Sequence, residues 1–360
     1  MAQQRIRVLA CSLAILGVYV STLMTSGCGS NSSSQQLKKN TVTDVYVAGW
    51  ENSSLNSIAL VAKYWKNGNP VVLSQQPSEA YAIAVSGNDV YVAGQVAGST
   101  HDIAVYWKNG VEADLTDGSS EAEADSIFVQ GTDVYVAGRD GDAAMYWKNG
   151  APVVLDANAL VSNVIVSGAD VYVAGWKYRT TQIDPTHIVD YPVALYWKNG
   201  DEVDLTDGRV TAYANSIFLL GSDVYVAGAT SSATYATDLI PTYWKNGSAV
   251  QLPGNDSFNW AAWIWANGTD VYVAGNDLNL NNRTYAATTW KDGTRSDLWN
   301  GNDTSNASQV TVDGTDVYIS GDLSANGGIQ RAGYWKNGQR VDVSSSTEMA
   351  SAKSIVVVTH

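Results

Sequence analysis

The residues of this chain that could do chemistry are mainly carboxylates close to glycines. Asp140-Gly141-Asp142 and the Asp-Leu-Thr-Asp-Gly runs at 114–118 and 204–208 offer oxygen atoms of the kind that calcium binds. These runs lack the full ligand spacing of a known calcium loop, and ordinary turns use the same residue types. The three histidines, His101, His187 and His360, are not at metal-ligand spacing. We therefore predict no metal site and no cofactor.

The sequence contains no motif for nucleophilic or phosphoryl-transfer catalysis. We find no Gly-x-Ser-x-Gly and no phosphate loop, and the cysteines Cys11 and Cys28 both precede residue 40. Carboxylates from distant parts of the chain could still converge in a folded ring, as a glycosidase or lyase requires. We predict that the protein is not an enzyme, with a carbohydrate-active hydrolase or lyase, its site at the mouth of a central channel, as the alternative.

These residues belong to an array of repeats. The phrases Asp133-Val134-Tyr135-Val136-Ala137-Gly138 and Tyr146-Trp147-Lys148-Asn149-Gly150 recur, with small changes, seven times between residues 44 and 338. In this unit β-branched and aromatic residues predict strands at 126–130, 134–137, 145–148 and 153–155. Asn149-Gly150 is a strong hairpin signal because both positions of that turn favour a positive φ. Each repeat is therefore predicted to supply four short antiparallel strands.

The two ends of the array complement each other. The array begins at Asp44-Val45-Tyr46 with no Ser-Ile strand before it, and it ends with Ser354-Ile355-Val356-Val357-Val358 with no Asp-Val-Tyr strand after it. Pairing of the last strand with the first would complete one hairpin and leave no open sheet edge. We predict an all-β fold: a seven-bladed β-propeller of four-stranded antiparallel blades, closed by pairing of the C-terminal strand with the N-terminal strand.

The succession of an apolar strand, Gly-x-Asp, Val-Tyr-Val-Ala-Gly, a loop and a Tyr-Trp strand resembles the kelch repeat from about residue 42 onward. The chain has Ala137-Gly138 where kelch has a Gly-Gly doublet, and its Trp is on the third strand rather than the fourth. The resemblance thus supports topology. It implies that the Ser-Ile strand is innermost and the Val-x-Leu strand outermost.

Two residues shared by all repeats are predicted to serve the fold. The Asp of each Asp-Val-Tyr phrase follows a turn where a carboxylate can accept backbone N–H bonds. The Trp of each Tyr-Trp phrase is expected to be buried between sheets rather than to hold one sugar per repeat. These tryptophans are Trp65, Trp107, Trp147, Trp197, Trp244, Trp290 and Trp335.

The first forty residues predict export and a lipid anchor. An apolar run from Val8 to Met24 follows two arginines, and Thr25-Ser26-Gly27-Cys28 resembles the lipobox of bacterial lipoproteins. We expect a signal peptide at 1–27, lipidation of Cys28, a flexible tether at 28–41 and the propeller at 42–360. The expected location is the bacterial cell envelope, at the outer membrane or cell surface, with membrane contact only through the anchor.

The formal net charge of −14 argues against nucleic acid and anionic lipid surfaces as partners, because both are bound by clustered Lys and Arg. The expected ligand is a protein or a carbohydrate. A purely structural ring with no specific ligand is a further alternative.

Repeats that depart from the shared pattern are the candidates for function. Because strands alternate in direction, the two tight turns of each unit lie on one face and the two variable connections on the other. A long loop at 176–193 carries several binding residue types, and an aromatic run occupies 259–265, where Trp263 stands at the position of Ser126. Trp263 and Trp265 are expected to share one face near the channel, either as a stacking platform or as space filling. The candidate ligand-binding residues are Trp176, Tyr178, Arg179, His187, Tyr191, Trp260, Trp263 and Trp265.

Overall fold

The described strands form seven four-stranded antiparallel sheets, the blades of a propeller. The computed structural model describes residues 41–53, 59–184, 187–232, 238–254, 259–279, 284–299, 303–324 and 328–360. The predicted signal peptide, Cys28 and nearly all of the predicted tether lie outside the described residues. Blade 1 has the strand order β28-β1-β2-β3, and blades 2 to 7 follow in chain order from β4 to β27.

The four strand positions repeat from blade to blade. The innermost strands, beginning with blade 1, are β28 (Ala350–Thr359), β4 (Ser78–Ser86), β8 (Ala122–Gln130), β12 (Ala159–Ser167), β16 (Ala212–Leu220), β20 (Trp260–Asn267) and β24 (Thr304–Asp313). The second strands are β1 (Thr43–Asn52), β5 (Asp89–Ala97), β9 (Asp133–Asp140), β13 (Asp170–Asp184), β17 (Asp223–Ser231), β21 (Asp270–Asn279) and β25 (Asp316–Ser324). The third strands are β2 (Leu60–Lys66), β6 (Asp102–Lys108), β10 (Ala143–Lys148), β14 (His187–Lys198), β18 (Leu239–Lys245), β22 (Thr284–Lys291) and β26 (Arg331–Lys336). The outer strands are β3 (Asn69–Val72), β7 (Val111–Asp114), β11 (Ala151–Asp156), β15 (Asp201–Asp204), β19 (Ser248–Gln251), β23 (Thr294–Asp297) and β27 (Gln339–Asp342).

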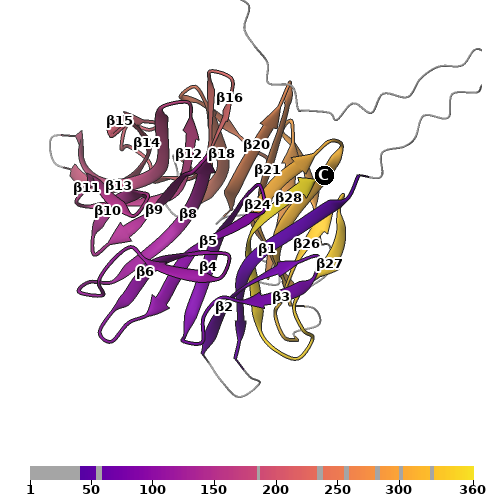
Figure 1. The fold of residues 1–360 in the computed structure, drawn as a ribbon. Helices are drawn as coiled ribbons and strands as arrows, with labels where there is room; N and C mark the ends of the chain where they lie inside the picture. Colours follow the sequence, from indigo (N-terminus) through magenta and orange to yellow (C-terminus); the bar gives the residue numbers. More distant parts are fainter. Residues whose placement is uncertain are drawn as a thin grey trace, which may run out of the picture. The chain divides into compact units, whose positions relative to one another are not determined.

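The ring closes through the two ends of the described chain, which lie side by side in Figure 1. β28 pairs antiparallel with β1, and Val357 lies opposite Val45 while Ile355 lies opposite Val47. β28 also packs against the innermost strands of both neighbouring blades, β4 and β24. The predicted fold and its closure are confirmed.

Strand direction separates the two ends of every blade. In blade 3 the register pairs Gln130 with Asp133 and Lys148 with Tyr135, so both tight turns lie at one end. We call this end of the propeller the turn face. The opposite end, with the connections such as 115–121 and 141–142, is called the loop face. The chain enters at Thr41 and ends at His360 on the turn face, because β1 begins there and β28 ends there.

The repeated polar residues bind one another on the turn face. The Asp133 carboxylate pairs with Lys148 at 3.0 Å and accepts a hydrogen bond from Asn149 at 3.0 Å. The Asn149 side chain in turn accepts the backbone N–H of Val134 at 2.8 Å, with Asn149 at φ 52°. Lys148 also lies 5.1 Å from the centre of the Tyr135 ring. We expected the Asp to accept backbone N–H groups; instead the Asn does so and the Asp holds the Lys and the Asn, because side chains of the third strand reach across the hairpin.

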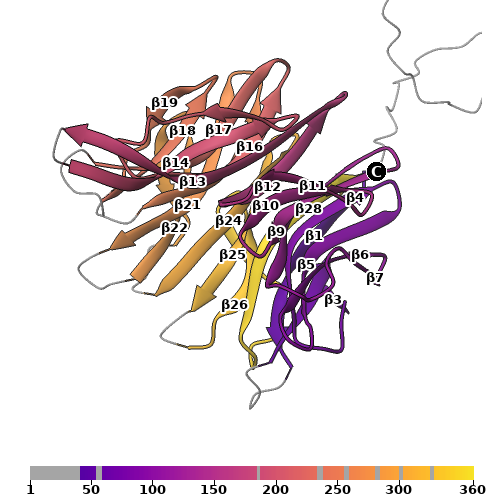
Figure 2. The ribbon, with the colours of Figure 1, turned by 90° about the vertical axis from the view of Figure 1, so that its left-hand side faces the viewer.

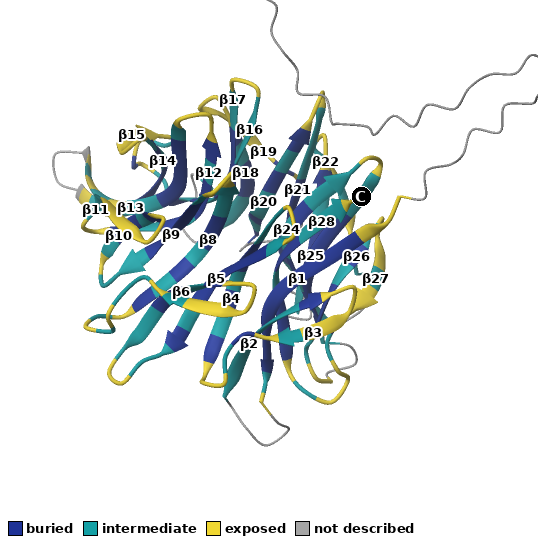
Figure 3. Ribbon diagram, viewed as in Figure 1, coloured by how far each residue is buried: buried dark blue, intermediate teal, exposed yellow. Residues whose placement is uncertain are grey.

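The repeated Trp and Gly fill the space between blades. All seven tryptophans of the Tyr-Trp phrases are at most 1% exposed, as predicted, and buried residues concentrate on the inner strands in Figure 3. Trp147 belongs to a buried cluster that includes Ala93 and Ala104 of blade 2 and Ile127 of its own blade. A Cβ on Gly138 would lie 2.0 Å from the carbonyl oxygen of Glu123, so the inner strand approaches too closely for any other residue.

We predict that Trp147→Ala destabilises the propeller by about 3–5 kcal/mol, because it removes a large side chain from a closely packed boundary between two blades. Urea unfolding followed by circular dichroism measures the change in the free energy of unfolding. Tyr178→Ala, which truncates a ring that is 64% exposed, is the matched control and should change little. A loss below about 1 kcal/mol for Trp147→Ala would contradict a structural role for the repeated Trp.

Candidate functional site

The innermost strands of all seven blades surround a central channel. A cavity of about 310 Å³ lies in the half of the channel nearer the turn face. Its walls are largely apolar and include Ile165, Phe128, Phe218, Trp263 and Trp265. It is therefore a concave site of the size that small ligands occupy.

A β-bulge divides each innermost strand at the same place. In blade 3 the pairing with β9 passes from Ala124 directly to Ser126, so Asp125 is the bulged residue. The bulged residues of blades 1 to 7 are Lys353, Tyr81, Asp125, Ser162, Asn215, Ala262 and Ser308. Because the extra residue reverses the alternation, the residue after the bulge faces the neighbouring blade.

The residue after the bulge binds the next blade in five of seven described cases. Ser126 accepts the backbone N–H of Val164 at 3.1 Å, and Asn163 accepts that of Ile217 at 2.9 Å. The corresponding pairs elsewhere are Ser216 with Ile264, Gln309 with Ile355, and Ser354 with Ile83. Ala82 and Trp263 hold this position in blades 2 and 6, and neither side chain contains an acceptor for such a bond.

The two channel tryptophans line one cavity, as the alternation of a strand predicts, while Ile264 between them is fully buried. Trp265 contacts Phe218, with ring centres 5.8 Å apart, and Tyr272, at 5.9 Å. Part of its role is thus to fill space. Trp263 also lines the cavity, and it packs against the buried cluster of blades 6 and 7 that contains Val310 and Ile319.

Asp125 is a bulged residue that makes no hydrogen bond or close ion pair with the described residues, and its charge interacts with those of Glu123 and Arg139. Ser162 and Ser308, at the same position in other blades, donate hydrogen bonds to the backbone of the next blade at 3.1 Å each, and Asn215 does so at 2.9 Å. Burial in the channel and the Glu123 carboxylate raise the pKa of Asp125 well above its usual range, while Arg139 opposes the shift. Burial also raises the pKa of Glu79, which lies near Lys353 and Tyr81. The loop-face half of the channel at blades 1 to 3 is therefore polar, and burial disfavours the charged forms of its carboxylates Asp125 and Glu79.

The segment predicted to be a long loop at 176–193 is instead an extended β-hairpin, visible at the left of Figure 2. β13 and β14 pair from Tyr172 opposite Lys198 out to Asp184 opposite His187. The expectation of a loop was wrong because β-branched residues, such as Thr181 opposite Val189, continue the backbone ladder. The side chain of His187 is outside the described structure.

The candidate residues of this hairpin face different ways. Arg179 binds Asp204 and Glu202 of β15, at 2.5 and 2.6 Å, and so is engaged within its own blade. Tyr191 lies opposite Arg179 on β14 and is half-buried. Trp176 contacts Tyr178 edge-on, with ring centres 5.7 Å apart, and Tyr213 of blade 5 at 5.1 Å.

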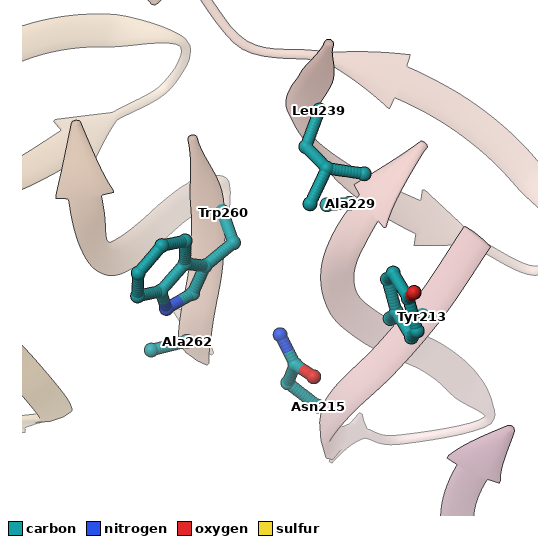
Figure 4. Close-up of a pocket in the computed structure, with 6 residues that line it drawn as sticks. All are labelled: Tyr213, Asn215, Ala229, Leu239, Trp260 and Ala262. Atoms are coloured by element: carbon teal, nitrogen blue, oxygen red, sulfur yellow. The ribbon is translucent and has the colours of Figure 1, made fainter. Parts of the chain in front are cut away.

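Trp260 lies at the loop-face end of β20, beside a second pocket. This pocket has a volume of about 310 Å³ and is lined by Tyr213, Asn215, Ala229, Leu239, Trp260 and Ala262. Figure 4 shows Trp260 and Tyr213 on opposite sides of it, with the Asn215 amide between them. Trp260 also contacts Tyr285 edge-on at 5.3 Å.

These rings form one series across blades 4, 5 and 6 on the loop face. We call Tyr178, Trp176, Tyr213, Trp260 and Tyr285 the aromatic track. Sequence reasoning identified Tyr178, Trp176 and Trp260 but missed Tyr213 and Tyr285. A comparison of repeats would have found Tyr213, because it precedes its bulged residue by two, as Trp260 does. Trp263 and Trp265 belong to the channel and not to this track.

In the described part of the chain, no group of three or more His, Cys, Asp or Glu side chains could hold a metal ion. The described residues also include no helix that is long and apolar enough to cross a membrane.

The chain is similar in fold to propellers of solved peptidase structures. It covers 95% of the β-propeller domain of the Trilobed protease from Pyrococcus furiosus, with 84% of its own length, a TM-score of 0.52 and 12% identity. That domain is described as having an open velcro topology, whereas β28 and β1 pair in the present chain. The present chain also resembles a structure from a study of two prolyl endopeptidases, with a TM-score of 0.50 and 12% identity. The match includes 88% of the present chain and 50% of that protein's chain. No protein-family model and no curated protein matches the sequence.

The prediction that the chain is not an enzyme is contradicted by these neighbours. They are propellers of peptidases, so the lack of sequence motifs within a propeller does not exclude a part in catalysis. At 12% identity the likeness shows the fold alone and assigns no catalytic residue to this chain. The kelch resemblance likewise receives no support from the family comparison.

We predict that Asp125→Asn stabilises the protein at pH 7, by about 1–3 kcal/mol, because it replaces a carboxylate that burial disfavours in its charged form. The pKa of Asp125 is raised in the folded state. Its carboxylate therefore lowers the free energy of unfolding as the pH rises from the pKa of the unfolded state, about 3.9, through the pKa of the folded state. The gain should therefore vanish below about pH 4, where both states are protonated. Urea unfolding of both proteins from pH 3.5 to 8 measures it.

Asp117→Asn is the matched control for this prediction. Hydrogen bonds from Ser119 lower the pKa of Asp117 in an exposed turn, so the substitution should not stabilise the protein at pH 7. Equal stability of Asp125→Asn and the parent protein at every pH would show that the carboxylate is not disfavoured in the channel.

Proposed function

We propose that the protein is a cell-envelope lipoprotein that binds a carbohydrate chain along the aromatic track of its loop face. The observation that carries this proposal is the succession of aromatic rings along the track, with a pocket between Tyr213 and Trp260. Trp176 contacts both Tyr178 and Tyr213, while Trp260 shares a pocket with Tyr213 and contacts Tyr285. The five rings come from three blades, and the pocket spans the one step without a ring contact, between Tyr213 and Trp260.

The chemistry of the track suits a neutral sugar chain. Aromatic faces stack on the apolar faces of sugar rings, and a small number of amides and hydroxyls fix orientation. The pocket between Tyr213 and Trp260 has no charged residue in its lining and contains one amide, that of Asn215. The nearby Arg179 is neutralised by Glu202 and Asp204, so the hairpin offers an anionic ligand no free cation at this position.

The point at which the chain enters the propeller agrees with this use of the loop face. Residue 41 lies on the turn face, where β1 begins. A lipid anchor on Cys28, joined through the tether at 28–41, would leave the propeller from that face. The loop face would then remain free for ligands.

A protein ligand is the second candidate. The β13–β14 hairpin exposes Tyr178 and Ile188, which are 64% and 66% exposed, and two exposed apolar side chains on one hairpin suit a protein contact. A protein partner would be expected to depend on both residues.

We predict that Trp260→Ala and Tyr178→Ala each weaken binding of the purified protein to neutral oligosaccharides by about tenfold, the loss expected for one stacked ring. A glycan array that includes cello- and chito-oligosaccharides locates a ligand, and calorimetry measures the affinities. Ile188→Ala, on the same hairpin as Tyr178, is the matched control and should bind sugars as the parent does.

If no neutral oligosaccharide binds, or if both Trp260→Ala and Tyr178→Ala bind as tightly as the parent, the carbohydrate proposal is wrong. Loss of a captured protein with Ile188→Ala and Tyr178→Ala together, without sugar binding, would favour the protein candidate instead.

A further inference from the structure

A further pocket lies on the loop face, between blades 3 and 4, and has a volume of about 360 Å³. Asp142 lines it from the turn between β9 and β10, and Asn158 lines it from the turn before β12. Trp176 and Tyr178 line it from β13. Two members of the aromatic track therefore form part of its wall. We call it the blade 3–4 pocket, and we call the pocket between Tyr213 and Trp260 the blade 5–6 pocket.

One ring contact joins the two pockets. Trp176 lines the blade 3–4 pocket and Tyr213 lines the blade 5–6 pocket. The centres of these two rings are 5.1 Å apart, and their planes are nearly perpendicular, at 88°. Each pocket is at the small end of the range for ligand sites, about 300–1,000 Å³, so one pocket holds only a short part of a polymer. A chain that occupies one pocket and continues past these rings reaches the other.

The blade 3–4 pocket has a polar lining that the blade 5–6 pocket lacks. Its lining includes two cationic side chains, those of Arg139 and Lys177. It also includes Asp142 and Asn158, which are both exposed. The blade 5–6 pocket contains one amide, that of Asn215. Because sugar hydroxyl groups both donate and accept hydrogen bonds, a wall that combines N–H donors with carboxylate and amide acceptors suits them.

Ion pairs hold the two cations of the blade 3–4 pocket in place. Arg139 Nε donates to the Glu123 carboxylate at 2.6 Å. Lys177 Nζ lies 3.0 Å from the Asp156 carboxylate and also pairs with a carboxylate of β15. With Asp142, the carboxylates here outnumber the cations, so an anionic sugar would meet like charge. A neutral sugar avoids this cost and meets donors that are already fixed.

We infer that the ligand of the aromatic track is a linear neutral oligosaccharide that occupies both loop-face pockets at once. This inference rests on the proposed carbohydrate function and extends it to a chain length. One part of the chain stacks in the blade 5–6 pocket, between Tyr213 and Trp260. Another part is hydrogen-bonded in the blade 3–4 pocket, beside Trp176. The polar groups of the blade 3–4 pocket fix the orientation of the chain.

The test measures how affinity depends on chain length, by calorimetry with the full chain. The probes are the cello-oligosaccharides and the chito-oligosaccharides, each from the disaccharide to the hexasaccharide. When one chain occupies both pockets, the second contact forms at a high effective concentration. In the series that binds, the hexasaccharide should therefore bind one-to-one and at least about tenfold more tightly than the disaccharide.

Variants in either pocket should reduce this dependence on length. Asp142→Ala combined with Asn158→Ala removes polar groups from the blade 3–4 pocket, and Trp260→Ala truncates a wall of the blade 5–6 pocket. In each variant the advantage of the hexasaccharide should fall below about threefold, because only one pocket still contributes fully. Asp117→Asn changes an exposed loop-face residue of blade 2 that lines neither pocket, so this matched control should keep the parent's dependence.

The outcomes separate this inference from the proposed function. Binding with the same affinity at every chain length would overturn the two-pocket inference and leave the carbohydrate function standing. So would a dependence on length that persists unchanged when the blade 3–4 pocket is altered. Absence of binding by both series at every length would overturn the inference together with the carbohydrate function.

Discussion

The pairing of β28 with β1 is the interaction on which the whole structure depends. Each blade packs its innermost strand against the next blade, so in a closed ring of seven no blade is left without a neighbour on either side. One of the seven hairpins is built from the two extremes of the described chain, and Thr43 lies opposite Thr359. Without this pairing, blade 1 would lack its inner strand, and the boundaries with blades 2 and 7 would open together.

Local chemistry made the fold predictable from the sequence. Asn149-Gly150, Lys148 and Asp133 interact within one hairpin, and Trp147 fills the space beside it. These residues recur together in every repeat and interact within it, so repetition alone indicated seven equivalent units. The count of strand types at the two ends then indicated closure.

The candidate sites were harder to predict, because they depend on residues of different blades and on the β-bulge. The bulge at Asp125 reverses which side chains of the strand face the next blade. The two-residue alternation of side chains along a regular strand does not predict such a reversal. Tyr213 and Trp260 lie in separate repeats and come to line one pocket only when blades 5 and 6 pack together. The hairpin at 176–193 looked like a loop because charged residues such as Lys177 and Arg179 interrupt its apolar pattern.

The blades differ in how they use the bulged residue and the residue after it. Blades 4, 5 and 7 use both the bulged residue and the residue after it to bind the next blade, whereas blades 2 and 6 use neither in this way. In blade 6 the positions hold Ala262 and Trp263, and in blade 2 they hold Tyr81 and Ala82. A ring closed by seven similar boundaries tolerates a few weaker ones, and those positions are then free for other chemistry.

Ring closure can be tested with a disulfide across the hairpin formed by the chain ends. The hydroxyl oxygens of Thr43 and Thr359 are 3.1 Å apart and exposed, so cysteines at these two positions lie within bonding reach. In a chain with Cys11 and Cys28 replaced by serine, Thr43→Cys combined with Thr359→Cys should form one intramolecular disulfide. The bond should raise the melting temperature, and reduction should reverse the increase. Free thiols after oxidation, or crosslinks only between molecules, would contradict closure of the ring by β28 and β1.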